Sequence, residues 1–169
     1  MKYRLAKTTD LEQLYSVMKD AGYIRAFFAN KEFTEVAALL RDYIFASHKK
    51  TTVVVCEDNT TIIAYSMFAP YKDYKKPQMP EVPQFEKYAY SRGTGVLTSY
   101  RGKKIGLGIR IEADAVAKKI GFIGLITDID ATNGASIRNN EKAGYELIQV
   151  YEDSYRDSGK NLIYKKDFY

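Results

Sequence analysis

The segment from Thr51 to Phe68 constrains the fold more than any other part of the chain. Thr51–Glu57 is rich in β-branched residues, and after the turn pair Asp58-Asn59 a second apolar run covers Thr60–Phe68. This pattern is typical of a β-hairpin, in which a short turn of residues that tolerate a left-handed backbone joins two strands. A hairpin is antiparallel, so the sheet that contains it cannot be entirely parallel.

Helical and strand patterns alternate on both sides of this hairpin. Apolar residues at helical spacing predict helices over residues 11–21, 33–47, 101–120 and 136–143. Shorter apolar or alternating runs predict strands over residues 2–6, 87–98, 122–129, 145–151 and 161–168. We therefore expect an α/β fold with a mixed, mostly antiparallel central sheet and helices on both faces. A single domain covering residues 1–169 suits this length.

The composition argues against several classes of protein. No apolar run reaches the roughly 18–20 residues that a membrane-spanning helix needs. The start of the chain, Met1–Leu5, lacks the apolar core of a secretory signal, so we expect a cytoplasmic protein without a membrane partner. Cys56 is the single cysteine and cannot form an internal disulfide. No cluster of cysteine and histidine indicates a metal site.

The formal net charge of +5 raises the question of a nucleic-acid partner. Lysines and arginines are spread along the chain in short pairs, and no standard nucleic-acid-binding motif is present. We therefore expect no nucleic-acid partner. A modest positive field also suits a polyanionic small molecule.

A predicted strand ends and a long predicted helix begins around Arg101–Gly106, which reads Arg-Gly-Lys-Lys-Ile-Gly. Backbone N–H groups at a helix start lack intrahelical acceptors and carry the positive end of the dipole, so they bind phosphate well. Each glycine inside a helix costs about 1 kcal/mol relative to alanine. Gly106 and Gly108 together therefore need a reason, and an anion site provides one. The alternative is a plain helix start with solvated lysines and incidental glycines. Neither common nucleotide-binding glycine motif matches this spacing.

A second notable segment lies downstream. Asn133 stands at a loop-to-helix turn, and Asn140, Gly144 and Tyr145 follow it. Taken alone, this segment is a short capped helix that ends at a glycine.

Together the two segments resemble the GNAT superfamily of N-acetyltransferases. The family's phosphate-binding turn reads R/Q-x-x-G-x-G/A with a valine five positions upstream of the first residue, and Arg101–Gly106 and Val96 occupy these places. The later family segment has an asparagine and, seven positions on, Y-E-K-x-G-F. Asn133 and the run Asn140–Tyr145 stand in that register. The resemblance implies the GNAT fold, in which a pair of central strands splays apart.

Two residues depart from the family pattern. Lys104 replaces the middle glycine of the turn, and Asn140 replaces a tyrosine thought to protonate the departing thiolate. A basic residue at the first position is normal in the mycothiol-synthase-like subgroup, whose T-G-V motif is similar to Thr94-Gly95-Val96. An amide cannot act as the acid, so Asn140 could only hydrogen-bond the coenzyme or the thiol.

The resemblance implies acetyl-CoA as acyl donor and no metal. It further implies coenzyme contacts from Thr94, Gly95, Val96, Arg101, Gly102, Lys103, Lys104, Ile105, Gly106, Leu107, Asn133 and Asn140. The acceptor implied is a primary amine of a small molecule or, alternatively, of a protein, which attacks the thioester directly in a ternary complex. A non-catalytic acyl-CoA-binding sensor is the alternative from another class, and a homodimer is a candidate assembly.

Catalytic residues are harder to assign. The strand before the turn contains no carboxylate, so Asp128 and Asp130, at the end of the next strand, are candidates for the base, with cap or surface roles as the alternative. Tyr151 is a candidate donor to the thiolate, and Asn140 a candidate to orient it. The proline-rich segment Pro70–Glu86 and the first two helices are expected to form much of the acceptor pocket.

Overall fold

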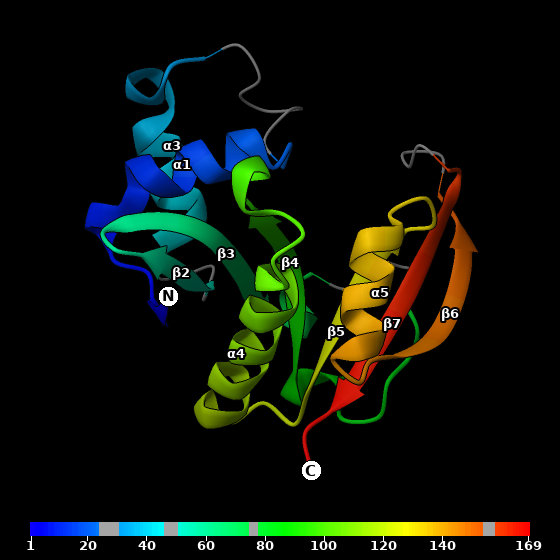
Figure 1. Ribbon diagram of the computed structural model, residues 1–169. Helices are drawn as coiled ribbons and strands as arrows, with labels where there is room; N and C mark the ends of the chain where they lie inside the picture. Colours follow the sequence, from blue (N-terminus) through cyan, green and yellow to red (C-terminus); the bar gives the residue numbers. More distant parts are fainter. Residues whose placement is uncertain (24–30, 46–50, 75–77, 154–157) are drawn as a thin grey trace.

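A seven-stranded sheet forms the centre of the computed structural model, which describes residues 1–23, 31–45, 51–74, 78–153 and 158–169 (Figure 1). In spatial order the strands are β1 (Lys2–Leu5), β2 (Thr52–Asp58), β3 (Thr61–Pro70), β4 (Tyr88–Val96), β5 (Gly124–Asp130), β7 (Lys160–Asp167) and β6 (Glu146–Glu152). Only β4 and β5 run parallel; the other neighbouring pairs of described strands are antiparallel. The predicted hairpin corresponds to β2 and β3, and the predicted α/β fold is confirmed.

Helices cover both faces of this sheet. They are α1 (Leu11–Asp20), α3 (Phe33–Phe45), α4 (Ile105–Ile120) and α5 (Gly134–Lys142). The side chains of β2 contribute to the cores on both faces of the sheet, because successive side chains of a strand point to opposite faces. Val53 and Val55 pack in the core under α1 and α3, whereas Val54 and Cys56 pack in the core under α4. Figure 1 shows α1 and α3 together at one end of the molecule and α4 and α5 on the opposite face.

A third, smaller core lies beside the C-terminal part of the sheet. It is formed by the buried residues Tyr71, Met79, Val82, Tyr88, Tyr90, Ile126 and Ile163. The described part of the proline-rich segment therefore packs against β4, β5 and β7, and residues 75–77 lie outside the described residues.

The parallel strands β4 and β5 separate after a short common stretch. They are paired from Tyr88 to Tyr90 on β4. Beyond this point β4 continues with β3 as far as Val96, while β5 continues with β7 as far as Asp130. The two strands form a fork (Figure 1), and the expected splayed pair is confirmed.

A bulge in β4 lies next to this fork. Met67 is opposite Gly93 and Phe68 is opposite Ser91, which leaves Arg92 as the extra residue. A bulge interrupts the strict alternation of side chains, so it can direct a residue to the face that a regular strand would deny it.

One helix boundary was predicted wrongly. The helix expected from Arg101 begins at Ile105, because Gly102 and Lys104 have positive φ angles of 79° and 62° and form a turn before it. The helix expected to end at Ser47 is described only as far as Phe45, and residues 46–50 lie outside the described part of the chain. No helix in that part is long and apolar enough to cross a membrane.

Candidate active site

The turn between β4 and α4 is held from both sides. The backbone N–H and the hydroxyl of Thr98 donate to the Asp20 carboxylate, at 2.6 and 3.0 Å, which ties the turn to the end of α1. Arg101 Nε donates to the Val96 carbonyl oxygen at 3.3 Å. The left-handed backbone at Lys104 then leads directly into the first residue of α4. The sequence that resembled a phosphate-binding turn is therefore an ordered turn at a helix N-terminus.

Different neighbours explain why each of the two glycines in α4 lacks a side chain. A Cβ atom on Gly106 would lie 2.9 Å from Asn139 Nδ2 of α5 and 3.7 Å from a methyl group of Val96. A Cβ atom on Gly108 would overlap the Tyr3 hydroxyl of β1. Gly106 thus keeps open a cleft between α4 and α5, and Gly108 permits close packing of the same helix on β1.

This cleft has a volume of about 660 Å³, and we call it the donor cleft. The predicted residues that line it are Thr94, Gly95, Val96, Arg101, Gly102, Lys104, Ile105, Gly106 and Asn133. Lys103, Leu107 and Asn140, which the sequence analysis also assigned to the coenzyme, are not among its lining residues. The Lys103 ammonium lies 4.7 Å from the centre of the Tyr100 ring.

A second cavity of about 570 Å³, which we call the acceptor cavity, adjoins the donor cleft. It is enclosed by the end of α1, by β4 around its bulge, by the end of β5 and by the start of α5. The residues that line both spaces are Ala21, Thr94, Arg110, Asn133 and Ser136. The two spaces therefore meet at the fork between β4 and β5.

Asp128 lines the acceptor cavity and is held by two donors. The Tyr90 hydroxyl donates to Asp128 Oδ1, and Asn161 Nδ2 donates to Asp128 Oδ2 at 2.9 Å. Asn161 Nδ2 also contacts the Tyr151 hydroxyl oxygen at 2.8 Å. The structure thus connects the predicted residues Asp128 and Tyr151 through Asn161, although Tyr151 is not among the residues that line the donor cleft or the acceptor cavity.

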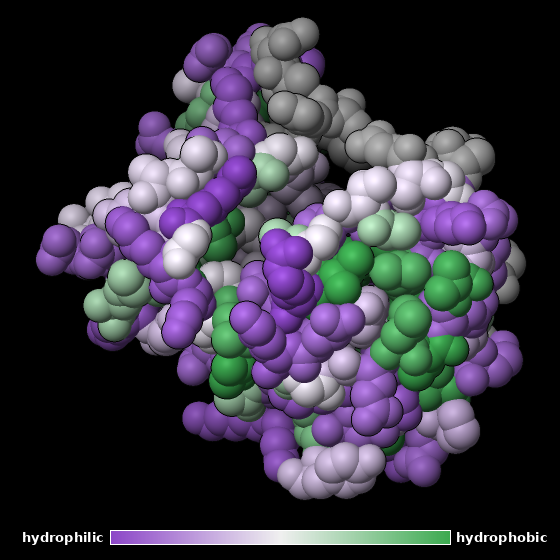
Figure 2. All heavy atoms as spheres, turned by 45° about the vertical axis from the view of Figure 1, so that its right-hand side comes forward, coloured by the Kyte–Doolittle hydropathy of each residue, from purple (hydrophilic) through white to green (hydrophobic). Residues whose placement is uncertain are grey.

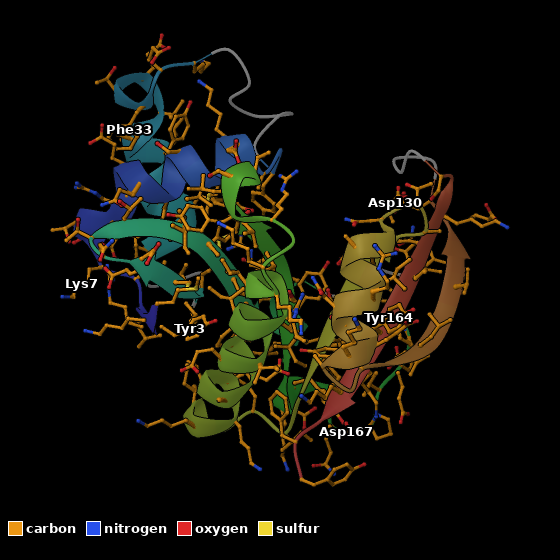
Figure 3. All side chains as sticks on the ribbon, viewed as in Figure 1. Tyr3, Lys7, Phe33, Asp130, Tyr164 and Asp167 are labelled. Atoms are coloured by element: carbon orange, nitrogen blue, oxygen red, sulfur yellow. The ribbon has the colours of Figure 1, made fainter. Side chains whose placement is uncertain are left out.

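Asp130 lies at the end of β5, where Figure 3 shows it beside the start of α5. Its carboxylate accepts hydrogen bonds from the hydroxyl and the backbone N–H of Thr132, at 2.5 and 2.8 Å, and from the backbone N–H of Ser158 at 3.4 Å. These bonds, those from Thr132 above all, lower the pKa of Asp130 to about 2. Its carboxylate is a turn-stabilising anion and a weak base at neutral pH.

Asn140 does not take the place that the sequence analysis gave it. Its side chain is buried, and its Nδ2 donates to the Ser136 carbonyl oxygen at 2.8 Å, one helical turn earlier. The same nitrogen lies 3.4 Å from Ser136 Oγ. Ser136 lines both the donor cleft and the acceptor cavity, whereas the Asn140 amide is turned back into α5. The reason is the i−4 carbonyl, which offers a buried amide a local partner.

Sequence reasoning missed Arg92, Arg110 and Ser136, all of which line the acceptor cavity. Arg110 carried a signal that could have been used, since it directly follows Ile109 on the apolar side of α4 and is only 5% exposed. Its Nη1 donates to Ser91 Oγ on β4 at 2.8 Å. Arg92 carried no such signal in the sequence, because its orientation depends on the β4 bulge.

Three further polar residues near Arg110 are hydrogen-bonded to one another through Asp114. The Tyr145 hydroxyl donates to Asp114 Oδ1 at 2.5 Å, and Lys166 Nζ lies 2.8 Å from Asp114 Oδ2. Burial raises the pKa of Tyr145 well above its ordinary value, so this hydroxyl stays a neutral donor. Within the described ranges, no group of three or more His, Cys, Asp or Glu residues could hold a metal ion.

Comparison with known proteins supports the fold and shows the family. The model of the acetyltransferase (GNAT) family matches residues 11–145. The fold is similar to that of a ribosomal-protein-alanine N-acetyltransferase from Brucella melitensis, with 20% identity, a TM-score of 0.74, and 99% of this chain and 100% of that chain covered. It is also similar to yncA from Salmonella typhimurium, solved with its cofactor acetyl-CoA, with 16% identity, a TM-score of 0.74, and 98% and 92% covered. No match was found among curated proteins. The chain belongs to the acetyltransferase (GNAT) family.

Proposed function

We propose that the protein transfers an acetyl group from acetyl-CoA to a primary amine, by direct attack in a ternary complex. The observation that carries this proposal is the meeting of the donor cleft and the acceptor cavity at the fork between β4 and β5, where they share Thr94, Arg110 and Ser136. A thioester in one space and an amine in the other would approach each other there. Membership of the acetyltransferase family supports the same reaction.

The donor cleft suits the coenzyme in charge and in shape. It is lined by the cations Arg101, Lys104, Arg110, Arg138 and Lys142, and no carboxylate is among its described lining residues. The turn before α4 offers backbone N–H groups at the positive end of a helix dipole, which is the ordinary site for a pyrophosphate. A side chain at Gly106 would intrude between α4 and α5, so the absence of a Cβ atom there leaves room for the ligand.

The reaction needs few groups from the protein. The neutral amine nitrogen attacks the thioester carbon, the C–N bond forms and the C–S bond breaks, the amine loses one proton, and the departing thiolate takes up a proton. Positioning and a proton acceptor are the main contributions that a protein can make.

We assign the amine proton to the Asp128 carboxylate. Asp128 lines the acceptor cavity, and the Tyr90 hydroxyl and the Asn161 amide hold its two oxygens in place. Asp130 lines the same cavity, but the hydrogen bonds that lower its pKa to about 2 make it a weak base. Tyr151 then acts as a positioning residue through Asn161.

We assign the hydrogen bond to the departing sulfur to Ser136. Ser136 lines both spaces where they meet, and the buried Asn140 amide contacts both its carbonyl oxygen and its Oγ. Asn140 would therefore influence the thiolate through Ser136 and would not touch it. Lys104, which stands where the family turn has glycine, supports placement in the mycothiol-synthase-like subgroup.

A turnover assay tests the function. Purified protein is incubated with acetyl-CoA and a panel of primary amines, and free thiol is measured together with the mass of the acetylated amine. Amine-dependent thiol release is expected. Tight binding of acetyl-CoA without thiol release across the panel would contradict catalysis and would indicate an acyl-CoA sensor.

A homodimer remains part of the proposal. Leu147, Ile148 and Val150 of the edge strand β6 are 49%, 38% and 51% exposed. Figure 2 shows apolar side chains gathered on the side of the molecule that carries α5 and β6. Exposed apolar patches of this kind are typical of protein interfaces. Sedimentation of the protein and of a Val150→Lys variant would test it, since only the wild type should dimerise.

A further inference from the structure

We propose that the acceptor amine also carries an anionic group, such as a carboxylate, and that Arg92 and Arg110 bind this group in the acceptor cavity. The inference rests on the proposed function and adds a substrate class to it. Its evidence is independent of the donor cleft motif, because it comes from the position and surroundings of two guanidinium groups.

Arg92 is fixed in place by three separate parts of the chain. Its guanidinium carbon lies 4.2 Å from the centre of the Tyr43 ring of α3 and 4.7 Å from the centre of the Tyr74 ring, which follows β3. Its Nη1 donates to Thr51 Oγ1, just before β2, at 2.5 Å. A guanidinium that contacts two rings and donates a hydrogen bond is already ordered, so it loses little conformational entropy when it binds a ligand.

The β4 bulge gives Arg92 its direction. As the extra residue between Ser91 and Gly93, Arg92 reaches Tyr43 and Thr51 on the α3 side and lines the acceptor cavity. Gly93, beside it, allows Tyr23 to close over the strand, since a Cβ atom there would lie 2.5 Å from Tyr23 Cε2. Among the described residues, Arg92 forms no ion pair with a carboxylate, so its charge is available to a ligand.

Arg110 presents a second guanidinium to the same cavity. It is 5% exposed, and its charge is permanent because arginine does not lose its proton in proteins. Asp114, about one turn further along the helix, accepts from Tyr145 on one oxygen and from Lys166 on the other. A buried charge without a close counterion is unfavourable, so an anion in the cavity would stabilise Arg110.

The coenzyme is not the obvious source of that anion. Arg110 lies four residues beyond Gly106, which is about 6 Å further along the axis of α4 and away from the turn that suits the pyrophosphate. The part of the coenzyme near the fork would be the uncharged pantetheine arm. An anion on the acceptor is therefore the better partner for Arg110, and it accounts for Arg92 as well.

The acceptor cavity is also lined by carboxylates, which come from a different element than its arginines. Asp128 and Asp130 lie on β5, whereas Arg92 belongs to β4 and Arg110 to α4. The cavity thus offers cations from one set of elements and anions from another. A molecule with an amine at one end and a carboxylate at the other matches this distribution.

Matched pairs of amines test the proposal. Amino acids of several lengths are compared with their carboxamides, which keep the amine and lose the negative charge. We expect kcat/KM to be at least about 10-fold higher for the acids, as for one good charge-assisted pair. Amidation lowers the pKa of the neighbouring amine and leaves more of it neutral, so intrinsic reactivity works against this expectation.

Arg92→Gln should reduce the preference for the acids to less than about 3-fold by raising their KM, while the carboxamides keep their rates. Arg41→Gln is the matched control, because Arg41 is exposed on α3. This substitution makes the same change in net charge, and the variant should keep the preference for the acids. Arg110→Gln can fail to fold because it removes a buried charge. Arg110→Lys keeps the charge and is therefore measured as well. Circular dichroism and acetyl-CoA binding report the fold of each.

Two outcomes would overturn the inference and leave amine acetylation intact. One is equal kcat/KM of the wild type for acids and carboxamides. The other is an Arg92→Gln variant that slows both members of each pair equally. Equal slowing of both members by Arg110→Lys would assign Arg110 to the thioester carbonyl and remove it from the acceptor site. Absence of thiol release with every amine would instead contradict the proposed function itself.

Discussion

The donor cleft and the acceptor cavity are built in different ways. Most of the donor cleft comes from the continuous segment Thr94–Gly106, and its other wall is formed along α5. The acceptor cavity takes residues from the end of α1, the β4 bulge, the middle of α4 and the end of β5. A turn that binds an anion through backbone N–H groups is a local structure, whereas a pocket for a particular amine is assembled from distant parts of the chain.

The charges of the two spaces differ as well. Among their described lining residues, the charged side chains of the donor cleft are all cations. The acceptor cavity has Arg92 and the shared Arg110 together with the carboxylates Asp128 and Asp130. One sign of charge suits a polyanion that many enzymes share. Both signs in one cavity suit a substrate with its own pattern of charge, so under the proposed function the acceptor cavity would determine the specificity.

The largest effect should come from closing the donor cleft. Gly106→Glu places a carboxylate where even a Cβ atom would lie 2.9 Å from Asn139 Nδ2. Crowding and like charge should weaken acetyl-CoA binding by about 100-fold, or about 2.7 kcal/mol, as measured by calorimetry.

Ile111→Glu is the control for this change. Ile111 is 49% exposed on the same helix and lines neither space. Its replacement by glutamate adds the same charge as Gly106→Glu. It should bind acetyl-CoA like the wild type. Unchanged affinity of a folded Gly106→Glu protein would mean that the coenzyme binds elsewhere.

The next effect should separate chemistry from donor binding. Asp128→Asn keeps the shape of the side chain and removes the proposed base, so kcat should fall by about 100-fold with acetyl-CoA affinity unchanged. Steady-state kinetics and calorimetry measure the two quantities. If kcat stays within a few-fold, another group accepts the proton.

Asp130→Asn is the matched carboxylate and should leave kcat nearly unchanged. The substitution should instead change how the free energy of unfolding depends on pH in the acid range. The pKa of Asp130 is lowered from 3.8 to about 2 in the folded protein, so its contribution is present above pH 3.8 and is lost as the pH falls toward 2. Urea unfolding at pH 5 and pH 2.5 should show a smaller loss of stability for the variant.

The same contrast explains what the sequence could predict. The order of strands and helices followed from local patterns, and the Arg101–Gly106 turn from residues close together in the chain. Its detailed backbone did not, because the left-handed Lys104 is favoured by no local rule. Arg92 and Arg110 were not found, since a bulge directs the first and the fork between β4 and β5 places the second beside the cavity.

Asn140→Ala tests a residue that the sequence suggested as catalytic. The structure gives it a hydrogen bond to the Ser136 carbonyl oxygen, so its loss should lower the free energy of unfolding by about 1–2 kcal/mol. Turnover should fall only a few-fold, through looser placement of Ser136. A loss of several orders of magnitude in kcat, with normal stability, would return Asn140 to the reacting atoms.

The smallest effect asks whether the donor turn acts through its backbone or through its charge. Lys104 has a φ of 62°, a conformation that costs a residue with a side chain about 1–2 kcal/mol, whereas glycine adopts it freely but has more freedom to lose on folding. Lys104→Gly should therefore raise the free energy of unfolding by about 0.5–1 kcal/mol, seen as a Tm higher by about 1–4 °C. Lys104→Ala removes the same charge and keeps the Cβ atom, so it should show no such gain. If both variants bind acetyl-CoA with the same few-fold loss, the Lys104 charge contributes to binding. If only the alanine variant loses affinity, the backbone conformation is what the coenzyme requires, and the donor cleft is a site of main-chain recognition.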